Sequence, residues 1–253
     1  MTSNQPRILV WDIENSPIEA YVWEHWDANV LHTIEDSYLL CVAFNWLGTG
    51  TETQWFRKAQ GKANDKALVK HIWELLDQAD YVIAHNGDNF DQKKANTRFL
   101  KYGMPPPSPY VQIDTLKEAK RNFALASNAL NEIVRFLDLG MKPPHEGIEL
   151  WMGCMDEVPS AWETMEKYNV HDVKLLAEVF DTLAPWIGQP GRAGPQANAQ
   201  QWGTHRCTKL TCGSPLVVAR GQRRTKSGVY QTYQCKTCGG YSQAKLRDDG
   251  KWK

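Results

Sequence analysis

Four acidic side chains and one tyrosine, drawn from three separate segments, are the residues whose types and spacing could do chemistry. Asp12 and Glu14 lie two residues apart in ILVWDIE, so on a strand both carboxylates project from one face. Tyr168 and Asp172 lie four residues apart in KYNVHDVKLL, so on a helix they share a face. The remaining acid, Asp91, ends the segment AHNGDNFD. Oxygen donors of this kind are the ligands that Mg²⁺ prefers in proteins.

Each of these segments also has a purely structural interpretation. An acidic pair near a strand end often belongs to a turn. Asp88 and Asn89 could cap the helix that follows them, and Phe90 could anchor the core. Neither role explains Asp91. His171 lies about 100° round the helix from the last acid of the set, and it is expected to be a surface or packing residue.

In this order, the motifs D-x-E, N-x-x-x-F-D and Y-x-x-x-D resemble the DEDD exonuclease superfamily, whose fold is ribonuclease H-like. The tyrosine is similar to that of the branch containing polymerase proofreading domains and free-standing relatives of the B-type polymerase exonuclease. The histidine branch places a histidine five residues before the last acid, where this sequence has Lys167. The resemblance covers roughly residues 7–187.

The resemblance implies a 3′→5′ exonuclease that hydrolyses phosphodiester bonds with two Mg²⁺ or Mn²⁺ ions, which stabilise the attacking and leaving oxygens. It implies that Asp12 bridges both ions and that Glu14 and Asp172 bind the ion that activates water. Asp91 would support the other ion through solvent. Tyr168 would orient the attacking water, since a phenol with an ordinary pKa of about 10 is a poor base at neutral pH.

A second cluster of potential ligands consists of four cysteines near the C-terminus. Two pairs with C-x4-C and C-x2-C spacing are separated by 22 residues, and in a chain without a secretion signal they predict one structural Zn²⁺ rather than disulfides: Cys207, Cys212, Cys235 and Cys238. A glycine follows the second cysteine of each pair and allows a tight turn. The looser first pair leaves His205 as an alternative ligand. The segment resembles a zinc ribbon.

Basic residues are concentrated in the same C-terminal part. Residues 1–188 carry a net charge of −10 and residues 189–253 a net charge of +10. A basic run is often only a solvated face, but here it is interleaved with tyrosines and has almost no acids, which favours a groove for nucleic acid. The candidate nucleic-acid contacts are Asn86, Phe90, Arg220, Arg223, Arg224, Lys226 and Tyr233. Trp11, Trp23, Trp26 and Trp46 could also stack on bases, although aromatic residues near strands more often lie in a core.

The elements that must position these residues follow from the apolar patterns. They predict strands at 8–14, 38–46, 51–56, 81–85, 110–114 and 229–235. They predict helices at 66–79, 91–103, 115–123, 127–138 and 160–183. Strands first, then alternation, then helices describe an α/β fold: a ribonuclease H-like mixed sheet flanked by helices, plus a small C-terminal zinc ribbon.

Composition divides the chain into two parts. The 253 residues, with 42% hydrophobic and 23% charged, are typical of a globular protein. The expected boundaries are 6–187 for the exonuclease domain, 188–203 for a Gly/Pro/Gln-rich linker and 204–253 for a zinc-ribbon domain that binds nucleic acid. No membrane span or leader is expected, which indicates a cytoplasmic protein of a bacterial or phage-infected cell.

The leading functional hypothesis is therefore a metal-dependent 3′→5′ exonuclease acting on single-stranded or frayed nucleic acid, with DNA favoured and RNA possible. A replication or repair protein is a further expected partner. Two alternatives remain open: a structure-specific endonuclease or ribonuclease on the same fold, and a non-catalytic nucleic-acid-binding protein.

Overall fold

A five-stranded mixed sheet forms the centre of the first part of the chain. The computed structural model describes residues 6–47, 54–140, 147–187, 207, 209, 212–225 and 228–245. The sheet has the order β5-β4-β1-β6-β7, from strands β1 (Ile8–Asn15), β4 (Leu39–Leu47), β5 (Gln54–Lys58), β6 (Tyr81–Ala84) and β7 (Val111–Asp114). Strand β4 is antiparallel to β1 and β5, whereas β6 is parallel to β1 and β7.

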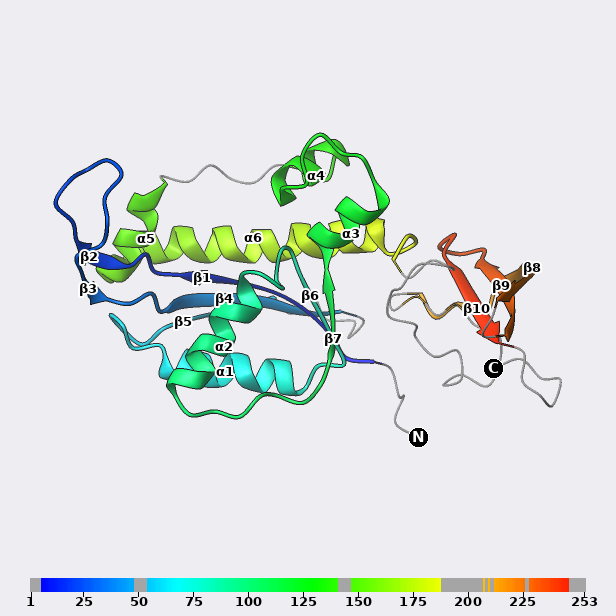
Figure 1. Cartoon of the computed structure of the whole chain (residues 1–253), viewed down its shortest axis with the longest axis horizontal. Helices are drawn as coiled ribbons and strands as arrows, with labels where there is room; N and C mark the ends of the chain where they lie inside the picture. The colour runs from blue at the N-terminus through cyan, green and yellow to red at the C-terminus, as the bar shows by residue number, and fades with distance from the viewer. Residues whose placement is uncertain are drawn as a thin grey trace. The chain divides into compact units, whose positions relative to one another are not determined.

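Helices cover both faces of this sheet. They are α1 (Lys66–Asp77), α2 (Asp91–Lys101), α3 (Thr115–Asn122), α4 (Leu130–Phe136), α5 (Ile148–Met155) and α6 (Pro159–Leu183). The long helix α6 runs along one side of the sheet, and α1 and α2 lie on the other side (Figure 1). The prediction of an α/β, ribonuclease H-like mixed sheet is confirmed.

Strand β1 is buried on both faces, and its alternation decides where its acids point. Leu9, Trp11 and Ile13 belong to the core cluster that also contains Ile72 of α1 and Phe99 of α2. Because successive side chains of a strand point to opposite faces, the residues between them face away from α1 and α2. Both acids of β1 are among those, so they lie on the side of the sheet that carries α6.

The structure contains several elements that the sequence patterns did not predict. They are a hairpin of β2 (Glu19–Tyr21) and β3 (His32–Glu35), the helix α5, and two strands near the C-terminus, β8 (Val217–Thr225) and β10 (Tyr241–Lys245). The strands of the hairpin are short and largely exposed, so they lack the apolar alternation on which strand prediction depends. The predicted helices and strands elsewhere are confirmed to within a few residues at their ends.

The C-terminal part forms a separate compact unit. By density of contacts it comprises residues 178–253 together with residues 118–125. Its three-stranded antiparallel sheet has the order β10-β9-β8, from β8 (Val217–Thr225), β9 (Gly228–Cys235) and β10 (Tyr241–Lys245). The predicted linker 188–203 lies outside the described residues, so the proposed domain boundaries stay predictions. In the part of the chain that is described, no helix combines the length and apolarity needed to cross a membrane.

Candidate active site

The two acids of β1 are each held by a side chain from a helix. Asn169 of α6 donates a hydrogen bond from Nδ2 to Oδ2 of Asp12, over 2.6 Å. Trp151 of α5 donates from Nε1 to Oε2 of Glu14, over 3.1 Å. Both acids are half-buried. These contacts hold both carboxylates on the α6 side of the sheet; the two-residue spacing predicted that they share one face.

A buried thiol sets the orientation of Asn169. Cys41 of β4 lies with its Sγ 3.6 Å from Oδ1 of Asn169. Burial, with added repulsion from Glu14 and Asp12, raises the pKa of Cys41 well above its ordinary value, so the thiol stays protonated and can donate. Because the amide oxygen of Asn169 faces this donor, its NH₂ group faces Asp12.

The third acid, Asp91, is bound to the backbone of the same strand. Strands β1 and β6 are paired only as far as Val10 and Ile83. Beyond that point the N–H of Ile13 donates instead to Oδ1 of Asp91, over 3.1 Å, and this bond is buried. Asp91, the first residue of α2, therefore completes the hydrogen bonding of β1 next to the carboxylates of that strand.

Burial dominates the electrostatics of Asp91. Desolvation raises the pKa of this carboxyl group from 3.8 to about 7, even though the N–H groups of Ile13 and Asp91 itself lower it. The nearby Asp114 raises it further. A divalent cation would supply the missing positive charge and would favour the ionised form.

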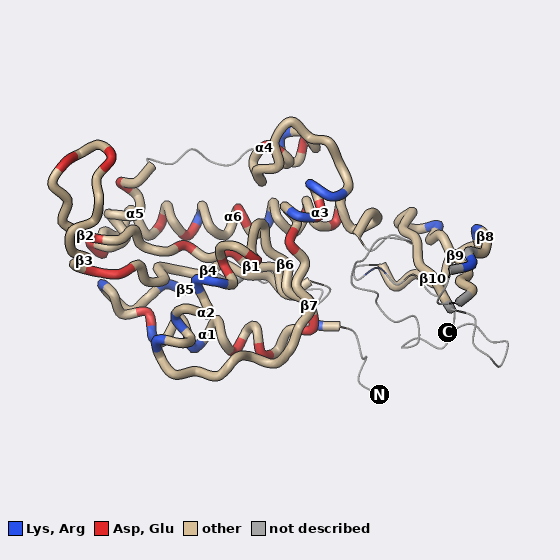
Figure 2. The backbone as a smooth tube through the Cα atoms, in the orientation of Figure 1, with Lys and Arg blue, Asp and Glu red and all other residues tan. Residues whose placement is uncertain are grey.

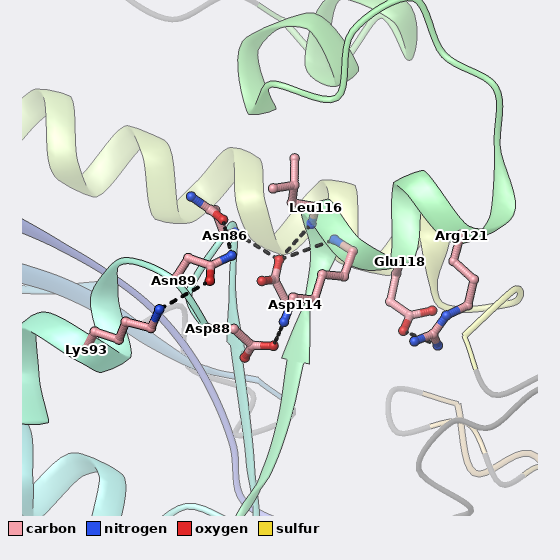
Figure 3. Close-up of polar contacts among 9 residues, drawn as sticks. Asn86, Asp88, Asn89, Lys93, Asp114, Leu116, Glu118 and Arg121 are labelled. Atoms are coloured by element: carbon pink, nitrogen blue, oxygen red, sulfur yellow. Dashed lines mark hydrogen bonds and ion pairs between the residues drawn. The ribbon is translucent and has the colours of Figure 1, made fainter.

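The turn between β6 and α2 places Asp91 through backbone geometry. Asn86 has a left-handed conformation, with φ of 64°, and Gly87 packs so closely that a Cβ atom there would lie 2.4 Å from Cβ of Ala84. Oδ1 of Asp114 at the end of β7 accepts a hydrogen bond from the N–H of Asn86, over 2.9 Å (Figure 3). Asp114 also accepts from the N–H of Leu116, at the start of α3.

This geometry excludes the structural interpretation of the turn given above. Asp88 forms an ion pair with Lys117, and Asn89 donates to Oδ1 of Asn86, so neither caps α2 (Figure 3). Phe90 occupies the position before α2 and is 39% exposed rather than anchored in the core. The exposed ring leaves its assignment as a nucleic-acid contact open.

Tyr168 and Asp172 form a hydrogen-bonded pair on α6. Burial raises the pKa of Tyr168 well above 10, and the negative charges of Asp172, Glu14 and Asp12 raise it further, as does the hydrogen bond to Asp172. The phenol is therefore neutral at physiological pH. Its ring packs edge to face against Trp151, with the centroids 6.2 Å apart. The electrostatic influence of Asp12 and Glu14 on Tyr168 indicates that the first and third motifs lie close together.

The donor set fits divalent cations with oxygen ligands. Asp12, Glu14, Asp91 and Asp172 offer carboxylates from three elements, which suits Mg²⁺ or Mn²⁺ and not a thiophilic metal. Four carboxylates could together surround two such ions about 3.5–4 Å apart.

Three residues of this site had not been identified from the sequence. Asn169 lies within the predicted helix next to Tyr168, and Asp114 ends a predicted strand, so both had a local signal. Trp151 had none, because α5 itself was not predicted. All three act through contacts between segments that are distant in the sequence, which periodicity does not report.

A family model described as the RNase_H superfamily matches residues 31–184. The chain belongs to the RNase H superfamily. The matched segment includes Asp91, Tyr168 and Asp172 and begins after the acids of β1. Membership supports a nuclease, and it confirms the recognition of the fold from the motifs.

A solved structure shares the architecture of this domain. The RNase H superfamily domain resembles the structure of the family B DNA polymerase from the hyperthermophilic archaeon Pyrobaculum calidifontis, with a TM-score of 0.53 and 15% identity. The likeness covers 72% of this chain and 25% of the polymerase chain, so this protein spans about a quarter of that relative. At this identity the likeness concerns the fold alone. No curated protein sequence matches the chain.

Outside the RNase H superfamily domain, the four predicted cysteine ligands converge. The Sγ atoms of Cys207 and Cys238 lie 3.6 Å apart, as do those of Cys212 and Cys235, and all four lie within 4.8 Å of one another. Four thiolates around one Zn²⁺ at the usual Zn–S distance would be about 3.8 Å apart. The geometry therefore fits a tetrahedral Zn²⁺ site.

The backbone forms tight turns around these cysteines and favours the thiolate at Cys235, whereas burial raises the pKa of Cys207 and Cys212 when no metal is bound. Gly213 and Gly239 have φ of 55° and 70°, the left-handed conformation expected for tight turns after each second cysteine. Burial acts to raise the pKa of the Cys235 thiol. Hydrogen bonds from the backbone of Cys238 and Thr237 and from the neighbouring thiols nevertheless lower it to about 6.

The predicted basic contacts lie partly on β8. Arg220 and Arg224 are exposed, and Nε of Arg220 donates to Oε1 of Gln234 on the neighbouring strand. Tyr233 is half-buried on β9. The side chain of Arg223 and the whole of Lys226 lie outside the described residues. The contribution of these residues to nucleic-acid binding stays a prediction.

Proposed function

We propose that this protein is a metal-dependent 3′→5′ exonuclease of the tyrosine-bearing DEDD type, acting on single-stranded or frayed DNA. The observation that carries this proposal is the convergence of three sequence motifs around the C-terminal half of β1. Asp12 and Glu14 lie on that strand, and Asp91 binds its backbone. The negative charges of Asp12 and Glu14 raise the pKa of Tyr168, so the tyrosine lies near both acids.

The residues would divide the work as follows. Two Mg²⁺ or Mn²⁺ ions held by Asp12, Glu14, Asp91 and Asp172 would stabilise negative charge on the attacking and leaving oxygens. Tyr168 is neutral, so its hydroxyl orients the attacking water as a hydrogen-bonding group and does not remove its proton. Asn169 keeps the carboxylate of Asp12 in place.

The four cysteines would hold one structural Zn²⁺, and the basic ribbon would bind phosphates of the substrate. A domain this small buries little apolar surface, so the metal would contribute much of its folding free energy. RNA remains a possible substrate, and a replication or repair protein a possible partner.

A 5′-labelled single strand of DNA, incubated with Mg²⁺ or Mn²⁺, tests the proposal. We expect a ladder that shortens from the 3′ end, and Asp12→Ala or Asp172→Ala should reduce its rate by at least about 10²-fold because transition-state charge is no longer neutralised. Internal cuts would indicate an endonuclease. Binding without cleavage, or variants within tenfold of the parent rate, would overturn the assignment.

A further inference from the structure

An exposed group of large apolar side chains lies on the hairpin formed by β2 and β3. Trp23 is 86% exposed and Trp26 is 84% exposed, in the loop between the two strands. That loop projects beyond the end of the central sheet (Figure 1). Exposed apolar patches of this kind commonly mark binding surfaces. We call residues 18–36 the aromatic hairpin; its exposed large apolar residues are Ile18, Tyr21, Val22, Trp23, Trp26, Val30, Leu31 and Ile34.

The other tryptophans near β1 behave differently. Trp11 is fully buried, and Trp46 packs against the core with the guanidinium of Arg7 4.5 Å from its ring centroid. These two indole rings are packed, whereas those of Trp23 and Trp26 remain in solvent. Their exposure suggests that these two rings bind another molecule.

The base of the hairpin is bonded to the strand that carries the carboxylates. Asn15, the residue after Glu14, donates from Nδ2 to Oγ of Ser37, over 2.8 Å. The backbone N–H of Ser16 donates to the carbonyl of Tyr38, also over 2.8 Å. The hairpin thus begins and ends beside the last residues of β1.

A second contact links the same base to the motif of Asp91. Nζ of Lys94 lies 3.5 Å from Oγ of Ser37 and 6.0 Å from the ring centroid of Phe90. The exposed ring of Phe90 directly precedes Asp91 in the sequence. Lys94 therefore connects the base of the hairpin with the exposed ring that precedes Asp91.

The charge of the hairpin selects which part of a nucleic acid could lie on it. Residues 18–36 contain five acids and no lysine or arginine, and acidic positions are visible on this loop in Figure 2. Phosphates find no positive charge to bind on the hairpin. A base that stacks on an aromatic ring, however, strengthens binding roughly 5- to 150-fold. An exposed like-charge contact costs about fivefold at most. Each stacked base therefore offsets at least one exposed like-charge contact with the backbone.

We propose that the aromatic hairpin binds unpaired bases of the nucleic-acid strand whose end lies at the carboxylates, with Trp23 and Trp26 as the stacking rings. This inference rests on the proposed exonuclease function and deepens it. Duplex bases are already stacked on one another, so the hairpin restricts productive binding to single-stranded ends. The aromatic hairpin would bind the bases of the strand, whereas the basic ribbon is expected to bind its phosphates.

Affinity for oligothymidylate of about twelve nucleotides tests this proposal. Binding is measured by fluorescence anisotropy in an Asp172→Asn background, so that the strand is not cut. We expect Trp23→Ala/Trp26→Ala to bind at least about fivefold more weakly and Trp23→Phe/Trp26→Phe to keep most of the affinity. The slope of log K against log salt should not change, because the hairpin has no lysine or arginine to pair with phosphate. Phe136→Ala, which removes a 69% exposed ring on α4, is the matched control and should bind as the parent does.

Two further probes separate the possible outcomes. A strand of abasic sites of the same length should bind the parent and the double alanine variant equally well. The p-nitrophenyl ester of thymidine 5′-monophosphate is too small to reach the hairpin, so the double variant with Asp172 intact should hydrolyse it at the parent rate. No hydrolysis of either ester or oligonucleotide by the parent would overturn the proposed function. Hydrolysis with unchanged oligothymidylate affinity in the double variant would overturn the hairpin proposal alone and would favour a protein partner for this surface.

Discussion

At the scale of single residues, the site combines two kinds of polar group with opposite requirements. The carboxylates must be ionised to bind cations, yet burial favours the protonated form of Asp91. Tyr168 must stay neutral to donate a hydrogen bond, and burial together with nearby acids keeps it so. The same apolar surroundings therefore help the phenol and oppose the carboxylate, and bound cations would reconcile the two.

Removing the hydroxyl of Tyr168 tests its role as an orienting group. Tyr168→Phe should lower kcat by roughly 10²-fold, a loss typical of a positioned polar group, with little change in nucleic-acid affinity. Because burial and neighbouring acids raise the pKa of this phenol, the parent should show no loss of activity from tyrosine ionisation as pH approaches 10. Single-turnover rates on labelled DNA measure both effects. Tyr110→Phe also removes a hydrogen-bonded hydroxyl from a half-buried tyrosine and should keep its rate; equal rates for both variants would reduce Tyr168 to a packing residue.

The raised pKa of Asp91 predicts how stability depends on pH when Mg²⁺ and Mn²⁺ are absent. The folded protein holds this proton up to about pH 7, and the unfolded chain releases it near 3.8, so the free energy of unfolding should fall as pH rises between these values. The loss attributable to this group is at most about 4 kcal/mol. Asp91→Asn keeps an oxygen for the N–H of Ile13 and removes the charge, so it should flatten this pH dependence.

Thermal unfolding followed by the helical circular dichroism signal, without chelator so that zinc is retained, measures this effect. Adding Mg²⁺ at pH 8 should stabilise the parent more than Asp91→Asn, because only the parent offers the fourth carboxylate. Parallel pH profiles for the two proteins would show that Asp91 titrates near its ordinary value.

At the scale of elements, the packing of the turn from β6 to α2 determines the position of Asp91 in the site. Gly87→Ala should destabilise the protein by about 1–3 kcal/mol and lower activity, since its Cβ would lie 2.4 Å from that of Ala84 and must push the turn that carries Asp91. Ala84→Gly removes the opposing Cβ, so the double variant should recover part of the lost activity. Nuclease rates and melting temperatures of the three variants provide the measurement. If the Ala84→Gly background gives no recovery, the clash between these two Cβ atoms is not the cause of the loss.

The elements also show how far sequence patterns reach. The strand of Asp12, the helix of Asp91 and the helix of Tyr168 were predictable because each has a buried face whose periodicity is written in its apolar residues. The aromatic hairpin and α5 were not, since the hairpin buries little and α5 follows a stretch without a clear pattern. The contacts of Asn169 and Trp151 with the strand acids depend on how helices pack on the sheet, which local periodicity does not contain.

At the scale of the whole molecule, charge separates the two units. The acidic part holds the carboxylate site and the basic part holds the cysteines, although the net charge of the chain is zero. A strand bound to both would therefore meet cation-dependent contacts at one place and direct phosphate contacts at the other. The two contributions should respond differently to salt.

Replacing two exposed arginines of β8 measures the second contribution. Arg220→Gln/Arg224→Gln should weaken binding of single strands and reduce the slope of log K against log salt by about 0.7 for each phosphate that these side chains neutralise in the parent. Hydrolysis of a mononucleotide ester should be unaffected. Lys70→Gln/Lys101→Gln removes the same charge from exposed positions on α1 and α2 and is the control. An identical slope in all three proteins would direct attention to a protein target for the ribbon.

The bond between Asp91 and the N–H of Ile13 has a consequence for descent. Asp91 completes the hydrogen bonding of a buried strand, so a lineage that abandoned catalysis would still lose stability if this residue were replaced by one without a side-chain acceptor. Glu14 accepts a hydrogen bond from the side chain of Trp151 and not from the backbone of a buried strand. Its substitution should therefore lower stability less. Among distant descendants of this chain, an acceptor side chain retained at position 91 would thus say little about whether the enzyme still works, whereas a retained Glu14 would say more.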